Sequence, residues 1–259
     1  MLEAAAVAAI AEREIRRFMT DRPRLLGALL IPFLFVALMG GILQVNLGRA
    51  SGFNFVGFMF TGVLGMTLFQ SAAAGMASLL EDRQSGLAQD IFVAPVSRLT
   101  IVLGKIGGES VVALLQGLPL FGLAIVLGVR LRPDQAPALL AAALVTALLG
   151  GAFGLGAMAM VRDQRGANHV FQFLLLPQLL LGGVLNPIRV LPWYLEVPSR
   201  LAPLRYAVDL IRGAAYGGSP EASRVVLASP LFDAAACGLL FTLFLAAGTA
   251  LFVRRQTLG

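Results

Sequence analysis

Long apolar runs with almost no charged residues are the feature that most limits how this chain can fold. Six runs of about 20 residues or more alternate with shorter connections, and a run of that length can cross the hydrocarbon core of a bilayer as a helix. The runs are residues 25–44, 55–80, 107–129, 137–161, 169–188 and 231–253. The sequence therefore predicts an all-α integral membrane protein, with six transmembrane helices in one domain spanning residues 25–259.

Composition excludes several classes of protein. The 259 residues are 58% hydrophobic and 13% charged, whereas a water-soluble domain has about 25% charged residues. A single cysteine, Cys237, and a single histidine, His169, rule out a disulfide framework and a zinc or haem site. The net charge of +6 comes from arginines scattered between the apolar runs, so we expect anchoring to the bilayer and no nucleic-acid binding.

Residues 1–24 have the periodicity of an amphipathic helix, which we expect to lie at the cytoplasmic surface. Its two faces are Ala4, Ala8, Ala11, Ile15 and Phe18 on one side and Arg13, Arg16, Arg17 and Thr20 on the other. Ile10 falls on the wrong side of this pattern. The alternative is a solvated start of the first transmembrane helix.

Orientation follows from the positive-inside rule. With the N-terminus inside, 12 of the 20 Lys and Arg residues fall on the cytoplasmic side. The count favours two cytoplasmic termini. The connection 189–230 weakens this assignment, because it would carry five arginines on the outer side.

Two connections are too structured to be simple loops. Residues 189–230 contain two short amphipathic pieces, closed by Gly213 and by Gly217 and Gly218, and Trp193 beside Tyr194 suits the membrane interface. We expect short interfacial or half-inserted helices there. Residues 81–98 carry apolar side chains flanked by charge, which predicts a short helix lying across the cytoplasmic mouth.

The predicted transmembrane helices hold no obvious source of energy. Lys105, Glu109, His169 and Asp233 all lie near predicted helix ends, whereas ion-driven carriers usually need ionisable groups or broken helices within the membrane. No serine has a histidine base in a protease-like motif, and no Walker A pattern occurs. If ATP is used, another chain binds it.

Polar side chains form a stripe on each of two predicted transmembrane helices, and these stripes are candidates for a substrate pathway. The candidates are Thr67, Gln70 and Ser71 on the second helix, and Phe171, Gln178 and Asn186 on the fifth. They can equally be hydrogen-bonding seams between helices. Because neither stripe carries a fixed charge, a pathway of this kind suits an amphiphilic cargo better than a strongly anionic one.

Three segments resemble the membrane subunits of ABC transporters of the type-2 permease class, which export drugs, nodulation factors and polysaccharides. These segments are the basic N-terminal helix, residues 81–86 with 93–98, and residues 203–212. The resemblance implies a coupling helix between the second and third transmembrane helices, which docks in an ATPase. It also implies re-entrant helices between the last two transmembrane helices. The implied coupling residues are Glu81, Asp82, Arg83, Gly86, Pro95 and Arg98.

The resemblance also implies partners. Two copies of the permease, forming a homodimer, would pair with two cytoplasmic ATPase subunits that bind ATP and magnesium, in the plasma membrane of a bacterium. The chain itself would bind no cofactor. Two alternatives remain at this point: a membrane subunit of an assembly complex, such as one for cytochrome maturation, and a secondary carrier.

Overall fold

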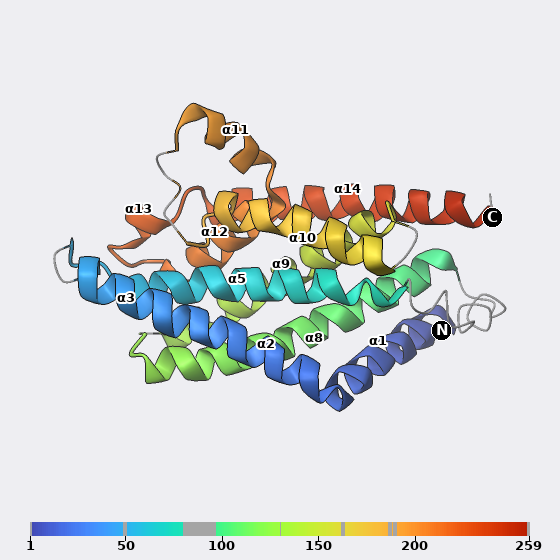
Figure 1. Ribbon diagram of the computed structural model, residues 1–259, viewed down its shortest axis with the longest axis horizontal. Coiled ribbons are helices and arrows are strands. Elements are labelled where there is room, and N and C mark those ends of the chain that lie inside the picture. Colours follow the sequence, from blue (N-terminus) through green and yellow to red (C-terminus); the bar gives the residue numbers. More distant parts are fainter. Residues whose placement is uncertain are drawn as a thin grey trace.

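Most of the computed structural model consists of long helices that run roughly along the long axis of the molecule (Figure 1). The structure describes residues 2–48, 51–79, 97–129, 131–161, 164–185, 188 and 191–257. Within those ranges no residue is in a β-strand. This confirms the all-α prediction.

The chain begins with α1 (Leu2–Thr20) and a first long helical segment. That segment is built from α2 (Arg22–Phe35), η1 (Val36–Gly40), α3 (Gly41–Leu43) and η2 (Gln44–Gly48). The two η segments are π-helical turns, and Pro32 lies inside α2 without ending it. Gln44 in η2 accepts a hydrogen bond from the backbone N–H of Phe55 at 2.8 Å, which ties the end of this segment to the start of the next helix.

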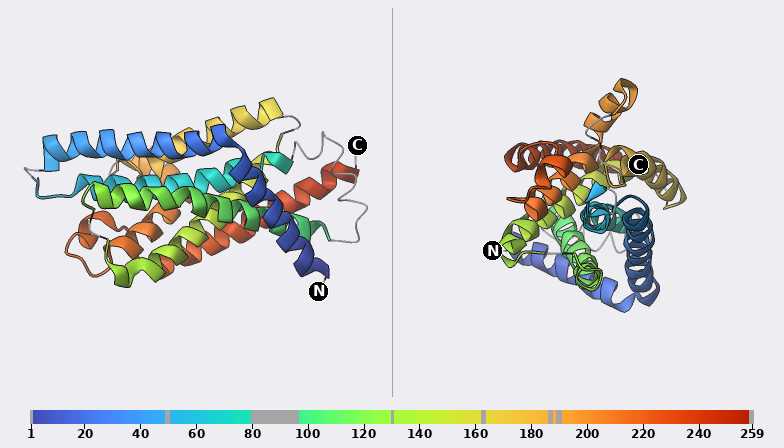
Figure 2. Two further views of the ribbon diagram at one scale, coloured as in Figure 1. Left: turned by 90° about the horizontal axis from the view of Figure 1, so that it is seen from below. Right: turned by 90° about the vertical axis from the view of Figure 1, so that its left-hand side faces the viewer.

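The middle of the chain supplies most of the core. Its helices are α5 (Phe55–Gly75), α8 (Arg98–Val126), the short η3 (Pro133–Gln135) and α9 (Ala136–Met158). α5 is buried along most of its length, with Phe58, Phe60 and Phe69 fully enclosed. Seen end-on, α5 lies near the centre of the bundle (Figure 2).

The C-terminal part contains both long and short helices. They are α10 (Gln164–Leu181), α11 (Trp193–Leu201), α12 (Pro203–Tyr216), α13 (Ala222–Val225) and α14 (Pro230–Thr257). α11 projects from the bundle, whereas α12 packs into it (Figure 1). The prediction of short helices between the last two long ones is confirmed. Gly213 does not end a helix as expected, because α12 continues to Tyr216 and stops before Gly217.

Five helical segments of the described chain are long and apolar enough to cross a membrane. They are Leu25–Gly48, Phe55–Gly75, Leu99–Val126, Pro133–Met158 and Ala222–Leu251. The predicted fifth helix, residues 169–188, is shorter than expected. α10 ends at Leu181, its apolar part is only Val170–Leu181, and Gly183 follows with a φ of +73° that favours glycine.

The third predicted helix, residues 107–129, was placed too late in the chain. α8 begins at Arg98, where the side chain of Ser97 caps it by accepting a hydrogen bond from the backbone N–H of Thr100 at 3.1 Å. The predicted run 107–129 misses these first turns because Lys105 interrupts it, although residues 99–104 are themselves mostly apolar. Both ends of the chain, the end of α5 and the start of α8 lie at the same end of the bundle (Figure 1).

Candidate functional site

The predicted coupling segment is framed by two well-defined helices. Five of its six candidates, Glu81, Asp82, Arg83, Gly86 and Pro95, lie outside the described residues. The sixth, Arg98, is the first residue of α8. The structure therefore fixes where the segment leaves α5 and enters α8, at the end of the bundle that also holds α1.

Close packing on two glycines holds α1 against the first turns of α8. A Cβ atom added to Gly104 would lie 3.2 Å from Cα of Val7, and one added to Gly108 would lie 2.8 Å from Cα of Ala11. Ile10 also packs at this contact, 3.1 Å from the same added Cβ on Gly104. The predicted apolar stripe of α1 was thus rotated: Ala4 and Ala8 are exposed, and Ile10 belongs to the packed face.

A buried ion pair joins the same two helices. Nζ of Lys105 lies 2.8 Å from Oε1 of Glu14, and both side chains are 1% exposed. Arg13 adds a second cation, with Nη2 at 2.8 Å from the same carboxylate oxygen. Burial alone would raise the pKa of Glu14, but the adjacent Lys105 and Arg13 outweigh it and hold that pKa below the ordinary value of 4.5.

Glu109, one turn further along α8, meets the last turn of α5. A Cβ on Gly75, the final residue of α5, would overlap the Glu109 carboxylate. Glu109 is buried. Sequence reasoning placed Lys105 and Glu109 at a helix end and gave them no role. The four-residue spacing of two charges in an otherwise apolar helix was the available signal.

The two predicted polar stripes have different surroundings. On α5, Thr67 and Ser71 are buried and Gln70 is half-buried. The hydroxyl of Ser71 has no hydrogen-bond partner among the residues that the structure describes. On α10, Gln178 accepts a hydrogen bond from the backbone N–H of Leu204 in α12 at 3.2 Å. Phe171 packs against the core. Asn186 lies outside the described residues. Gln178 therefore contributes to a seam between helices, and within the described ranges no hydrogen bond joins the two stripes.

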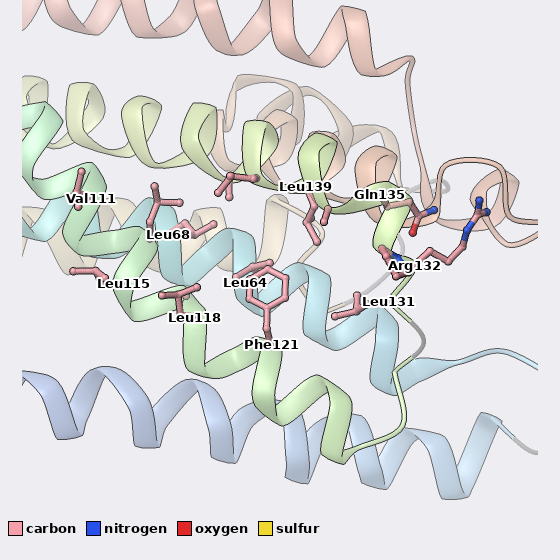
Figure 3. A pocket seen from close by; sticks show the side chains of 16 residues that line it. Leu64, Leu68, Val111, Leu115, Leu118, Phe121, Leu131, Arg132, Gln135 and Leu139 are labelled. Atoms are coloured by element: carbon pink, nitrogen blue, oxygen red, sulfur yellow. The ribbon is translucent and has the colours of Figure 1, made fainter.

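The sequence did not predict an apolar groove of about 540 Å³ on the side of the bundle (Figure 3). Leu64 and Leu68 of α5 form part of its lining, together with side chains of α8 and α9 such as Phe121 and Leu139. Leu118 of α8, which lines the groove, is 61% exposed, so the groove opens on the outer surface of the bundle.

Polar groups occur at one end of this groove. Figure 3 shows Arg132 and Gln135 there, while leucine and phenylalanine side chains occupy the rest. Arg132 forms an ion pair with Asp134 at 2.6 Å, and Gln135 donates a hydrogen bond to the carbonyl of Gly217 at 2.9 Å. An apolar cavity with polar groups at one end matches the shape of an amphiphilic molecule.

Fold and site together define a multi-pass membrane protein with a permease-like helical bundle and an amphipathic N-terminal helix docked on it. The chain belongs to the ABC-2 type transporter family, whose family model matches residues 5–216. This is a family of transporter membrane subunits, which work with an ABC ATPase.

Curated relatives agree with this assignment. The chain is 28% identical over 219 residues to the inner membrane transport permease YadH of Escherichia coli (strain K12), covering 82% of each chain. It is 29% identical over 200 residues to nodulation protein J of Sinorhizobium fredii, covering 73% of each. It is 27% identical over 192 residues to a putative transport permease, ycf38, of Cyanophora paradoxa, covering 73% of this chain and 66% of that one, just under two thirds.

Proposed function

We propose that the chain is the permease subunit of an ATP-driven exporter that moves an amphiphilic, lipid-like or drug-like molecule across the plasma membrane of a bacterium. Two copies form a homodimer and pair with two ATPase subunits, which bind ATP and magnesium. Both termini face the cytoplasm. In this arrangement ATP binding closes the ATPases, and the segment 81–98 transmits their movement to the helices that follow it.

The observation that carries this proposal is the buried contact of Glu14 with Lys105. Lys105 lies seven residues after Arg98 and is fixed to α1 by charge and by close packing. Glu109 extends the same rigid unit to the end of α5. A push on the segment between α5 and α8 is therefore delivered to α1, α5 and α8 together, as transmission to the membrane helices requires.

The amphiphilic cargo is supported by the groove between α8 and α9. Its lining is apolar apart from Arg132 and Gln135 at one end, and it opens toward the surface of the bundle where lipid would lie. A lipid-like or drug-like molecule can enter such a groove from the bilayer without losing apolar contact. A glycan would find few polar partners there.

The coupling assignment is tested by purifying the chain together with its ATPase and measuring ATP hydrolysis in lipid. Replacing Glu81 and Arg83 by alanine should weaken copurification or uncouple hydrolysis from transport. The matched control replaces Glu221 and Arg224, which cap and end the short helix α13 and line neither cavity of the bundle, by alanine. Unchanged assembly and transport in the Glu81 and Arg83 variant would contradict the assignment.

The orientation is tested by thiol labelling. Ser223 in α13 is exposed, and the natural Cys237 is buried, so labelling of a Ser223→Cys variant has a low background. A membrane-impermeant maleimide should label this variant in intact cells. Labelling that appears only after permeabilisation would place the re-entrant side in the cytoplasm.

A further inference from the structure

A second cavity, of about 360 Å³, lies among α11, α12 and α14 and shares no lining residue with the apolar groove. The helices around it meet at the end of the bundle away from both termini (Figure 1). Its walls carry two arginines, Arg200 and Arg205, and two carboxylates, Asp209 and Asp233, beside the rings of Tyr206 and Phe232. A cluster of opposite charges in one cavity is unusual for the interior of a membrane protein.

The surroundings of Asp233 meet only part of its hydrogen-bonding capacity, because its side chain shares one hydrogen bond with the Asp209 carboxyl. The residue is 1% exposed, and its Oδ2 has no hydrogen-bond partner among the described residues. The neighbouring Asp209 carboxylate already accepts bonds from the backbone N–H groups of Leu227 and Ala228, at 2.8 and 2.9 Å. Because buried carboxylate oxygens are nearly always hydrogen-bonded, Asp233 calls for a donor from a molecule in the cavity.

The two arginines retain donors for an anion on the other side of the cavity. Arg205 donates to the hydroxyl of Ser199 at 2.8 Å, and Arg200 donates to the carboxylate of Glu196 at 2.6 Å. A guanidinium group has five N–H donors, so these bonds leave others for phosphate oxygens. The cavity therefore offers an anion site and a cation site a short distance apart.

The surroundings place this site at a membrane interface. Trp193 and Tyr194 of α11 are exposed, as is typical of aromatic residues at headgroup level. Phe232 in the cavity wall is exposed, and so are Leu239 and Leu243 further along α14. Their spacing of seven and four residues puts them on one helix face, so the cavity continues into an apolar strip along α14.

We propose that this cavity binds the headgroup of a zwitterionic phospholipid that has a primary ammonium group. The phosphate lies against Arg200 and Arg205, the ammonium group donates to Asp233, and the acyl chains follow α14. The proposed binding does not depend on transport activity, because it applies equally to a transported lipid and to a permanently bound one.

The chemistry of the ammonium group makes the proposal specific. The primary ammonium of phosphatidylethanolamine has three N–H donors, whereas the quaternary group of phosphatidylcholine has none, and phosphatidylglycerol has no cation. A hydrogen bond to a charged group is strong enough to change affinity by about tenfold or more. The chain should therefore prefer phosphatidylethanolamine over the other two by about that factor.

Native mass spectrometry of the purified, delipidated chain with equal amounts of the three lipids measures this preference. Asp233→Asn should bind the three lipids alike, while Arg205→Gln should weaken all three because each carries a phosphate. Asp134→Asn, an exposed carboxylate at the same end of the bundle and outside this cavity, is the matched control and should keep the preference. Arg205→Gln also tests the site if Asp233→Asn does not fold.

Adding soluble glycerophosphoethanolamine separates two sources of the same headgroup. If millimolar glycerophosphoethanolamine displaces phosphatidylethanolamine, the site exists and recognises the headgroup alone. If the chain keeps its preference for phosphatidylethanolamine and no displacement occurs, the site exists and requires the complete lipid. Equal binding of the three lipids by the unmodified chain, or a preference that survives in folded Asp233→Asn, overturns the proposal. If the preference survives in folded Asp233→Asn, the buried carboxyl of Asp233 is explained by a proton that it shares with Asp209.

Discussion

Nζ of Lys105 lies 2.8 Å from Oε1 of Glu14, in a contact from which solvent is almost excluded. The two residues are 91 positions apart in the sequence, so this ion pair makes the N-terminal helix part of the bundle. Two glycines of α8 let the backbones approach closely at the same place. α1 therefore moves with α8 rather than as a separate surface element.

Removing one partner of this pair should be costly. We expect Glu14→Gln to lower the free energy of unfolding by about 1.5–3 kcal/mol, because the buried ammonium group of Lys105 loses a charge-assisted hydrogen bond. The measurement is unfolding in detergent micelles. The matched control is Glu12→Gln in the same helix, where the ion pair with Arg16 has an N–O distance of 2.6 Å but side chains that are 61% and 80% exposed. That change should cost less than about 1 kcal/mol, and equal losses would contradict the buried pair.

The same pair predicts how stability depends on pH. Because the pKa of Glu14 is lower in the folded chain than its ordinary value of 4.5, the contribution of its carboxylate to stability is fully present above that value and is lost as pH falls below it. The difference in unfolding free energy between the natural chain and Glu14→Gln should therefore be constant from neutral pH to about pH 5 and shrink at lower pH. A difference that is unchanged well below pH 4.5 would contradict this assignment.

Close packing of α9 on α5 gives a third prediction. A Cβ on Gly150 would overlap the carbonyl oxygen of Phe69, and one on Gly154 would overlap that of Ala73. We expect Gly150→Ala to destabilise the chain by about 1–3 kcal/mol, as overpacking does in cores. Gly122→Ala in α8, where an added Cβ meets nothing within 4 Å, is the control. It should be neutral or stabilising, because alanine favours helix more than glycine.

Much of this architecture could be predicted from the sequence, because the bilayer imposes a length and a polarity that apolar runs reveal. The contact of α1 with α8 could not be predicted, since pairing of Glu14 with Lys105 depends on the relative rotation of two helices. The early start of α8 at Arg98 was missed because the charge of Lys105 interrupts the apolar run, and its burial against Glu14 does not show in the sequence.

The candidate site was less predictable than the fold. Polar stripes in membrane helices are compatible with a pathway or a seam, and only the structure shows that Gln178 bonds to Leu204 of a neighbouring helix. The apolar groove gave no signal, because leucines that line a cavity are indistinguishable in sequence from leucines that face lipid. The pathway role of the six candidates stays a prediction: Thr67, Gln70, Ser71, Phe171, Gln178 and Asn186.

Loss of the Gln178 side chain should loosen the start of α12. Gln178 satisfies the backbone N–H of Leu204, which is fully buried at the start of α12. Gln178→Leu should therefore lower the free energy of unfolding by about 1–3 kcal/mol, the cost of a buried donor left without a partner. Gln178→Glu keeps an acceptor at that position and should retain more of the stability. If Gln178→Leu is as stable as the natural chain but blocks transport, Gln178 lines the pathway instead.

Filling the apolar groove should block the proposed cargo without disturbing assembly. Leu118 of α8 lines the groove and is largely exposed, so Leu118→Trp can occupy the groove without displacing the core. We expect uptake or efflux of a fluorescent amphiphile to fall by about tenfold, a change of about 1.4 kcal/mol in effective binding, while copurification of the ATPase is unchanged. Ile125→Trp is the control, since Ile125 lies seven residues further along α8, is exposed and does not line the groove. If the two variants transport equally well, the groove is not on the path of the cargo, and a position nearer the centre of the permease pair takes its place.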